Sequence, residues 1–168
     1  PESLIAQFPS QRRGEDRLLC LDRRAGQIAH HQFKEIPHLI DPNSLLVFNN
    51  SRVRKARIFA RSLDTGSEQE FLLLEEQRPA YWKCMVRRAK RQRLGREYEF
   101  PQGLRAKIVG IEAEFRYVQF DSPFGEEYLE EWGHIPLPPY IRRSDESIDA
   151  QRYQTIYAAP TGSAAAPT

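Results

Sequence analysis

The stretch A-R-I-F-A-R-S-L-D-T-G-S-E-Q-E-F-L-L-L-E, from Ala56 to Glu75, decides the fold. It contains two strand-like segments, Arg57–Leu63 and Gln69–Glu75, with the turn-forming pair Thr65-Gly66 between them. Four more short segments follow at similar spacing, at Trp82–Arg87, Glu97–Phe100, Leu104–Ile111 and Glu114–Phe120. Several of them alternate apolar with polar residues, and glycines separate them. This pattern is typical of a small all-β sandwich or barrel.

An amphipathic helix is predicted directly after these segments, at Pro123–Trp132, with an aromatic stripe on one side. We interpret the stripe as core packing rather than as a ligand site; its members are Phe124, Tyr128, Leu129 and Trp132. The sequence therefore predicts a β-rich insert over residues 58–132. The flanking parts, residues 1–57 and 133–168, are predicted to belong to one other domain.

The N-terminal part predicts a hairpin, with strands at Arg17–Asp22 and Gln27–Phe33 joined by a turn. Phe33–Ile40 is either a short helix or an irregular link, and a turn follows it. Leu45–Phe48 is a continuous apolar run, which predicts a strand buried on both faces. Asn49, Asn50 and Arg52 follow this strand, at the kind of position where α/β folds build sites. Either substrate binding or turn capping explains these polar residues.

Composition limits the class of protein. The chain has 168 residues, which is enough for one ordinary domain or two small ones. Its net charge is +2. It has no long apolar run and no signal-peptide pattern, so we expect a cytosolic protein without a membrane span. We expect Cys20 and Cys84 to be free, buried thiols, and no Cys/His spacing suggests zinc, so no metal is predicted. The chain does not begin with Met, and we expect a few residues to precede it.

Basic residues form two local runs although the net charge is small. The first run comprises Arg52, Arg54, Lys55, Arg57 and Arg61; the second comprises Arg87, Arg88, Lys90, Arg91, Arg93 and Arg96. Each run is either a solvated face or a surface for phosphate groups.

The C-terminal part begins with G-H-I-P-L-P-P-Y-I-R-R, Gly133–Arg143. Its three prolines predict a stiff, extended, non-sheet segment that presents Tyr140 and Arg142. A short helix is predicted for Asp149–Tyr157, with Tyr153 on the same face as both of its ends. That face is either a pocket wall or a docked helix, and we prefer a helix-stabilising role to that of a base for Asp149.

The last residues, Gly162–Ala166, are small enough for a ligand to approach the backbone, or they are simply the end of a fragment. We expect the proline segment and the tyrosine-bearing stretch to line one cavity.

Read in order, these segments resemble the S-adenosylmethionine:tRNA ribosyltransferase-isomerases of queuosine biosynthesis. The matching stretches are L-I-A-Q-F-P, R-L-L-C-L-D with G-Q-I-A-H, L-L-V-F-N-N-S-R-V with A-R-I-F-A-R, T-G, I-P-L-P-P-Y-I-R, D-x-x-R-Y-Q-T-I-Y-A and G-S-A-A-A-P-T. The resemblance spans essentially the whole chain and implies a mixed α/β domain, incomplete here, with an inserted small β-barrel domain. It also implies that this chain corresponds to the N-terminal half of such an enzyme.

The resemblance implies transfer and isomerisation of the ribosyl group of S-adenosylmethionine onto the 7-aminomethyl-7-deazaguanine base of a tRNA. The product is epoxyqueuosine-tRNA, and adenine and methionine leave. S-adenosylmethionine is then a consumed co-substrate, and no permanently bound cofactor is expected. We expect a monomer, and we expect the 168-residue chain alone to be inactive.

Candidate site residues follow from these arguments. Substrate contacts are predicted for Asn49, Asn50, Arg52, Arg57, Tyr140, Arg142, Tyr153, Gln154 and Thr155. tRNA contacts are predicted for Arg87, Arg88, Lys90, Arg91 and Arg93. Arg57 either contacts phosphate or pairs with carboxylates, and no general base is assigned. The alternative functions are a non-catalytic RNA-binding β-barrel module and a unit for folding or interaction only.

Overall fold

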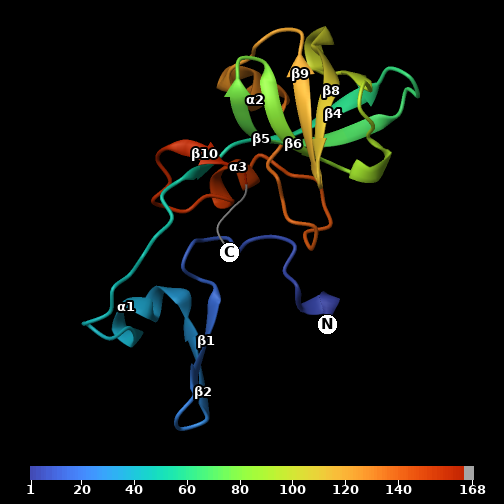
Figure 1. Cartoon of the computed structure of the whole chain (residues 1–168). Helices are drawn as coiled ribbons and strands as arrows, with labels where there is room; N and C mark the ends of the chain where they lie inside the picture. The colour runs from blue at the N-terminus through green and yellow to red at the C-terminus, as the bar shows by residue number, and fades with distance from the viewer. Residues whose placement is uncertain (165–168) are drawn as a thin grey trace. The chain divides into compact units, whose positions relative to one another are not determined.

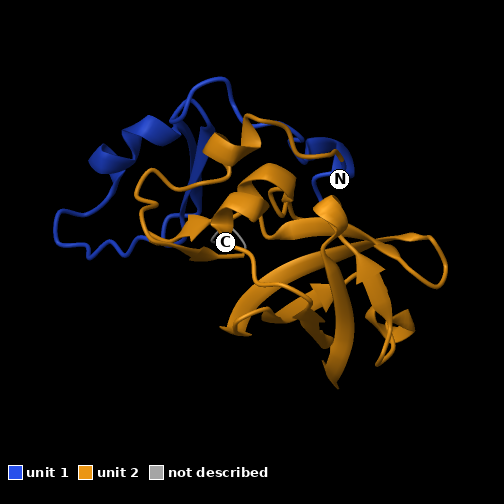
Figure 2. Ribbon diagram, turned by 90° about the horizontal axis from the view of Figure 1, so that it is seen from above, with its two compact units in different colours: residues 1–48, 140–142 blue, residues 49–139, 143–168 orange. Residues whose placement is uncertain are grey.

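The structure is a computed structural model that describes residues 1–164, and Figure 1 shows the course of the chain. The chain divides into two compact units, coloured blue and orange in Figure 2. Unit 1 comprises Pro1–Phe48 and Tyr140–Arg142, and unit 2 comprises Asn49–Pro139 and Arg143–Thr168. Each unit is described by itself below.

Unit 2 contains a closed barrel of six antiparallel strands in the order β4-β5-β6-β9-β8-β7. The strands are β4 (Arg57–Ser62), β5 (Glu68–Arg78), β6 (Tyr81–Val86), β7 (Glu97–Glu99), β8 (Arg105–Glu112) and β9 (Phe115–Phe120). Each of the six predicted segments forms one of these strands. The prediction of a small β-barrel is therefore confirmed.

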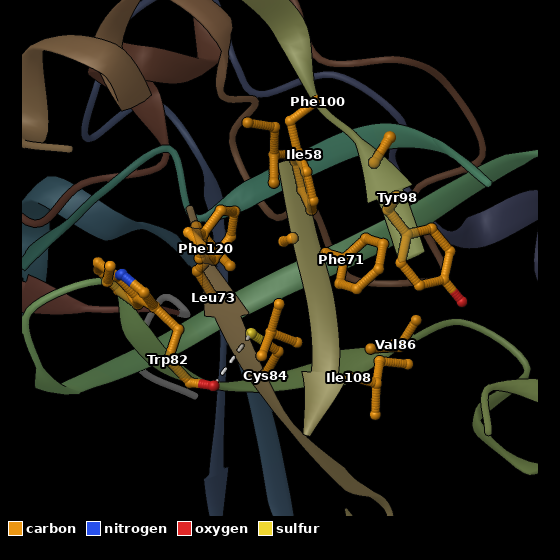
Figure 3. Packing of buried hydrophobic residues seen from close by; sticks show 14 of the residues in the cluster. Ile58, Phe71, Leu73, Trp82, Cys84, Val86, Tyr98, Phe100, Ile108 and Phe120 are labelled. Carbon is orange, nitrogen blue, oxygen red and sulfur yellow. Dashed lines mark hydrogen bonds between the residues drawn. The ribbon is translucent and has the colours of Figure 1, made fainter. Parts of the chain in front are cut away.

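The barrel is filled by the apolar residues that alternate along its strands (Figure 3). Ile58, Phe71, Leu73, Ile108 and Val118 are each 0% exposed. Their neighbours in sequence point outward, as the two-residue period of a strand requires. Aromatic rings meet edge to face in this core: the centroids of Phe71 and Tyr98 lie 4.9 Å apart at 79°.

Helix α2 (Glu126–Trp132) packs against the barrel core, which confirms the predicted helix and its aromatic stripe. Leu129 is buried, and Phe124, Tyr128 and Trp132 are partly buried against the same cluster. The ring of Phe124 stacks on Trp82 with 5.3 Å between centroids. The stripe is thus part of the core and not a ligand site.

The two-stranded hairpin β1 (Arg17–Asp22) and β2 (Gln27–Gln32) forms unit 1's sheet, as predicted. Its turn is held by Asp22, whose Oδ1 accepts hydrogen bonds from the backbone of Arg24 at 2.8 Å and of Ala25 at 3.0 Å. Gly26 supplies the positive φ of +66° that closes the turn. The ambiguous segment after the hairpin is helical, with η2 (Phe33–Glu35) and α1 (Ile36–Leu39); a further short helix, η1 (Glu2–Leu4), begins the chain.

The prediction of a buried strand at Leu45–Phe48 is wrong for this chain. These residues form no strand, and Leu45 and Val47 are 89% and 88% exposed. An apolar run becomes a buried strand only when neighbouring strands and a covering layer are available. No strand in residues 1–164 pairs with this run.

The predicted helix at Asp149–Tyr157 is also shorter than expected, because α3 ends at Arg152 (Asp149–Arg152). Tyr153 leaves the helical region at ψ 29°, so it does not share a helix face with Tyr157. The chain then reaches β10 (Thr161–Ser163), which pairs in parallel with β3 (Arg52–Val53). Directly after α3, the side-chain amide of Gln154 pairs with the backbone of Val53 in β3, so the chain leaves the helix there.

Residues 135–138 form no strand, as predicted for the proline segment, and a turn follows at Pro139-Tyr140. Both cysteines are free thiols; Cys84 is buried, and burial raises the pKa of its thiol, whereas Cys20 is only partly buried, contrary to prediction. Of the segment Gly162–Ala166, where a ligand was predicted to approach the backbone, Gly162 and Ser163 lie in β10. Residues from 165 onward fall outside the described part of the chain. Two further short helices, η3 (Ala89–Arg91) and η4 (Pro101–Gly103), lie in loops of unit 2.

Candidate functional site

Two of the predicted groups of substrate residues come together in unit 2. Residues 49–54 run beside residues 155–163. Three backbone hydrogen bonds and the β3–β10 strand pair join them. Ala159 N donates to Asn50 O at 2.8 Å, Arg52 N donates to Pro160 O at 2.7 Å, and Arg54 N donates to Ser163 O at 3.0 Å, beside the β3–β10 pair. Sequence reasoning selected both segments without predicting that they are neighbours.

Asn49 and Thr155 meet at one end of this pairing. Thr155 Oγ1 donates a hydrogen bond to Asn49 O at 2.9 Å. The Asn49 side chain accepts bonds from the backbone N and the hydroxyl of Ser51, at 2.8 Å and 2.7 Å. Substrate binding and turn capping were both left open for Asn49. These two bonds to Ser51 show that its side chain caps a turn. Asn50 and Arg52 are exposed on the same stretch.

Gln154 acts as a side-chain extension of the β3 edge. Its Oε1 accepts a hydrogen bond from Val53 N at 2.8 Å, and its Nε2 donates to Val53 O at 2.6 Å. A side-chain amide that makes both bonds replaces a neighbouring strand. Gln154 therefore fixes the position of Tyr153 and Thr155 relative to β3.

Asp149 is committed to an ion pair. Both of its carboxylate oxygens accept hydrogen bonds from Arg143, at 2.6 Å and 2.8 Å, and Oδ2 also accepts one from Glu146 N. The bidentate guanidinium lowers the pKa of this buried carboxyl below its usual value. Asp149 thus holds the start of α3, in the stabilising role that we preferred over that of a base.

A cluster that sequence reasoning missed lies at the start of β4. Asp145 Oδ1 accepts hydrogen bonds from Arg57 Nη2 at 3.0 Å and from His134 Nδ1 at 2.9 Å, and Oδ2 accepts one from Ile135 N at 3.0 Å. Arg57 therefore pairs with a carboxylate, which is one of the two alternatives stated for it. Residues 57, 134 and 145 have no spacing that would have linked them in the sequence.

The remaining predicted substrate residues, Tyr140 and Arg142, belong to unit 1. Tyr140 is 57% exposed, and its carbonyl accepts a hydrogen bond from Gln7 Nε2 at 3.1 Å. Arg142 N donates to Gln7 Oε1 at 2.7 Å, and its guanidinium pairs with Glu2. Within unit 1, residues 140–142 are thus joined to the N-terminal part of the chain by the side-chain amide of Gln7. A cavity shared with Tyr153 stays a prediction.

The predicted RNA-contact residues lie on an exposed loop of unit 2 between β6 and β7. Arg88 adopts a positive φ of 55°, which turns the chain into the short helix η3. A hollow of about 540 Å³ lies at this loop, lined by Asp64, Lys90, Arg91, Arg93, Leu94, Gly95 and Arg96. Arg96 pairs with Asp64 through two nitrogens, whereas no carboxylate within residues 1–164 pairs with Lys90, Arg91 or Arg93.

A buried polar network supports this basic loop from inside the barrel. Arg116 on β9 is 4% exposed and donates hydrogen bonds to the carbonyls of Gln92, Ala113, Phe115 and Ala89. Gln92, also buried, bonds to Gln69 and to the hydroxyl of Tyr98. Burial raises the pKa of Tyr98 to about 12, so this phenol remains a hydrogen-bond donor at neutral pH. The loop is therefore pre-shaped before any ligand binds.

Within residues 1–164, no group of three or more His, Cys, Asp or Glu side chains is arranged to hold a metal ion. None of the helices that the structure describes is long and apolar enough to cross a membrane.

Comparison with known proteins decides the family. A sequence model of the family described as "Queuosine biosynthesis protein" matches residues 1–168. The chain belongs to this family. The resemblance inferred from its motifs is therefore confirmed.

Similar members of the queuosine biosynthesis family are known by name. A protein from Treponema denticola, named S-adenosylmethionine:tRNA ribosyltransferase-isomerase, is 46% identical over 175 residues, which cover 100% of this chain and 50% of the relative. A protein of the same name from Borreliella afzelii is 41% identical, covering 100% of this chain and 49% of the relative. The chain thus spans about half the length of these relatives and corresponds to their N-terminal half.

A solved structure is also similar in sequence. The S-adenosylmethionine tRNA ribosyltransferase from Thermotoga maritima is 30% identical, and the match covers 96% of this chain and 54% of that one, with a TM-score of 0.42.

Proposed function

We propose that this chain is the N-terminal part of an enzyme that transfers and isomerises the ribosyl group of S-adenosylmethionine onto tRNA. The observation that carries the proposal is the similarity over the whole chain to relatives named for this activity. The acceptor is a 7-aminomethyl-7-deazaguanine base in the tRNA, and the product is the epoxyqueuosine base. Adenine and methionine are released, so S-adenosylmethionine is consumed.

This reaction makes specific physical demands. The sulfonium of S-adenosylmethionine acidifies the C5′ protons, so a base must be positioned near that carbon. The amine of the acceptor base must be held close to the sugar. A tRNA needs cationic side chains along its backbone and flat faces for an unstacked base.

We assign the substrate contacts to exposed or half-buried polar groups on both units. They are Asn50, Arg52, Tyr153 and Thr155 beside the β3–β10 pair, with Asn49 and Gln154 as the residues that fix this segment, and Tyr140 and Arg142 on unit 1. Arg57 is committed to Asp145 and acts through that carboxylate. The flanking residues 1–57 and 133–168 are proposed to be parts of one mixed α/β domain, with residues 58–132 as its inserted barrel domain.

The tRNA backbone is assigned to the basic loop of unit 2. Lys90, Arg91 and Arg93 are exposed, have no carboxylate partner among residues 1–164, and border the hollow described above. Arg87 and Arg88 extend the same surface. Because the buried network fixes the loop, little ordering entropy is lost when phosphates bind.

The basic loop also favours a second candidate function, that of an RNA-binding module without chemistry of its own. One assay separates the two. A protein of the relatives' full length that contains this chain is incubated with S-adenosylmethionine labelled in the ribose and with precursor tRNA. Release of adenine with label on the tRNA supports the enzyme. Tight tRNA binding without adenine release leaves only the binding module. If the protein neither releases adenine nor binds tRNA, both proposals are contradicted. The 168-residue chain alone is expected to give no turnover.

The RNA surface has its own test, in which tRNA affinity is measured as a function of salt. Removing three charges with K90Q, R91Q and R93Q should reduce the slope of log affinity against log salt by about 0.7–0.9 for each lost contact. The matched control removes three charges that are already paired with Glu97 or Glu99, namely R61Q, R105Q and K107Q. Equal losses in the two triple variants would contradict a specific surface.

We further propose that the complete protein is a cytosolic monomer.

A further inference from the structure

Only one of the two ring nitrogens of His134 forms a hydrogen bond within residues 1–164. Its Nδ1 donates to Asp145 Oδ1 at 2.9 Å, and no residue among 1–164 forms a hydrogen bond with its Nε2. The His134 side chain is 44% exposed, whereas that of Asp145 is 12% exposed. We propose that His134 is a catalytic base of the ribosyl transfer, with Asp145 and Arg57 as positioning residues. This inference rests on the proposed function.

The carboxylate of Asp145 is fixed by three donors. Oδ1 accepts from His134 Nδ1 and from Arg57 Nη2, and Oδ2 accepts from the backbone N of Ile135. These bonds come from two different parts of the chain, so the carboxylate has little freedom to rotate. The ring of Phe59 meets the imidazole edge to face, with 5.2 Å between centroids and a 73° angle. The imidazole is therefore held in one orientation by a bond at one nitrogen and a ring contact.

The tautomer follows from this hydrogen bond. An acceptor carboxylate at Nδ1 requires the proton on that nitrogen, so neutral His134 carries its lone pair on Nε2. The nitrogen that forms no hydrogen bond within residues 1–164 is the basic one, and it belongs to a half-exposed side chain.

The backbone around His134 is held as firmly as its side chain. His134 N donates to Arg57 O at 2.7 Å, and Arg57 N donates to His134 O at 3.2 Å, which forms an isolated bridge to β4. The preceding residue must be glycine, because a Cβ on Gly133 would lie 2.2 Å from Lys55 O and 2.5 Å from Leu129 O. The pair Gly133-His134 thus allows the chain to pass close enough to β4 for the contact with Asp145.

The charges around the imidazole suit a group that gains and loses a proton. Asp145 faces it with a negative charge, which compensates the imidazolium once it forms. Arg57 shares that carboxylate from β4 and offsets part of its charge while the imidazole is neutral. Lys55 is paired with Glu130 of α2, and Arg143 is paired with Asp149 of α3, so both cations are compensated.

The proposed step balances as follows. The Nε2 lone pair takes a proton from C5′ of S-adenosylmethionine, and the electron pair of the broken C–H bond stays on that carbon beside the positive sulfur. His134 becomes an imidazolium that donates from Nδ1 to Asp145. The electron pair on C5′ then forms the C4′=C5′ double bond as the C4′–O bond breaks, and the pair released to that oxygen forms C1′=O as the C1′–N bond to adenine breaks. Adenine leaves with the electron pair of that bond and takes the proton from His134 Nε2, which restores the neutral ring.

The test uses the full-length protein and measures kcat, KM, their pH dependence and the exchange of the C5′ protons of S-adenosylmethionine with D₂O. For H134Q we expect kcat to fall at least 100-fold with KM within threefold, and C5′ exchange to be lost. The pH dependence of kcat should differ between H134Q and the parent. Added imidazole should restore part of the rate of H134A. D145N should lower kcat by about tenfold or more with little change in KM, as expected for loss of a positioning group.

The matched control is H31Q in unit 1, because His31 also pairs with a carboxylate, Glu35, at 3.3 Å. It should keep the parental kcat and pH profile. The inference is overturned if H134Q retains kcat within threefold with the parental profile. It is also overturned if H134Q and H134A lower the thermal midpoint along with kcat and imidazole restores nothing, since the residue is then structural. Failure of the unmutated protein to release adenine would instead refute the proposed function.

Discussion

The barrel of unit 2 and the hairpin region of unit 1 treat their apolar residues in opposite ways. In the barrel, alternate residues such as Phe71 and Val118 are completely buried, because the sheet closes on itself around them. In unit 1, residues from the hairpin and from the following run remain on the surface, among them Leu19, Leu21, Ile28, Leu45 and Val47. The two regions have similar strand-like sequences, yet only one of them encloses a core.

The core of unit 2 is the main source of the chain's stability. Burial stabilises a protein in proportion to the apolar area removed from water, and the described residues bury that area mainly in unit 2. The buried network below the basic loop and the Asp145 cluster both include residues of the barrel strands, Arg116 on β9 and Arg57 on β4. Tests of these features are therefore interpretable in the 168-residue chain, whereas residues of unit 1 contribute little to its stability.

The largest effect is expected from a truncation in the barrel core. F71A should lower the free energy of unfolding by about 4 kcal/mol, because it leaves a cavity among Tyr98, Phe100 and their neighbours. V47A in unit 1 should change it by less than about 0.5 kcal/mol. Tryptophan fluorescence during urea unfolding measures this, since Trp82 and Trp132 both lie in unit 2. Similar losses in both variants would break the comparison.

A smaller effect is expected from the buried ion pair of unit 2. D149N removes the carboxylate that binds Arg143 through two hydrogen bonds and should cost about 3 kcal/mol at neutral pH. The exposed pair Arg12–Glu15 of unit 1 is the control, and E15Q should cost less than about 0.5 kcal/mol.

The Asp149 contribution should also depend on pH. The folded-state pKa of Asp149 lies below its ordinary value of 3.8, so the stabilisation is present above that pH and is lost as the pH falls through the folded-state pKa. The difference in unfolding free energy between parent and D149N should therefore shrink in acid. A difference that stays constant down to pH 2 would contradict this assignment.

Loss of the buried guanidinium below the basic loop comes next. R116M removes the donor for four carbonyls and should destabilise unit 2 by about 2 kcal/mol. Its more specific consequence is faster amide hydrogen exchange in residues 88–96. R24M, at the exposed hairpin turn of unit 1, is the control and should leave both quantities unchanged. Normal protection of the loop in R116M would show that the network does not shape it.

A further effect concerns alkaline pH. Burial raises the pKa of both Tyr98 and Tyr128 to about 12, from the ordinary value of 10. The unfolded chain therefore loses these protons first, and the stability of unit 2 should fall as the pH rises from 10 to 12. Urea midpoints measured across this range should fall less in the double variant Y98F/Y128F than in the parent. Parallel curves would mean that these phenols titrate normally.

Local patterns in the sequence predicted much of the fold. The period of two in Ile58–Ala60–Ser62 and in the other barrel strands is a property of neighbouring residues, so it is visible without any structure. The same holds for the hairpin turn at Asp22–Gly26 and for the helix that carries Leu129. The spacing of these strands indicated either a sandwich or a barrel, and the resemblance to the family implied the barrel.

Features that depend on distant partners were not predictable. Leu45–Phe48 has the composition of a buried strand, but burial requires other strands, and none in the described part of the chain pairs with it. Gln154 was predicted to lie in a helix, yet its amide pairs with Val53, about a hundred residues earlier. The Asp145 cluster escaped notice for the same reason, because its three members meet only in the folded chain.

The central claim is that unit 2 encloses its own core in this chain and unit 1 does not. Native-state hydrogen exchange on the 168-residue chain tests it most directly. Amides of β5, β6 and β9 should exchange only through global unfolding of unit 2, whereas those of Leu45, Leu46 and Val47 should exchange at rates close to an unstructured peptide. Equal protection of the two sets of amides would contradict the claim.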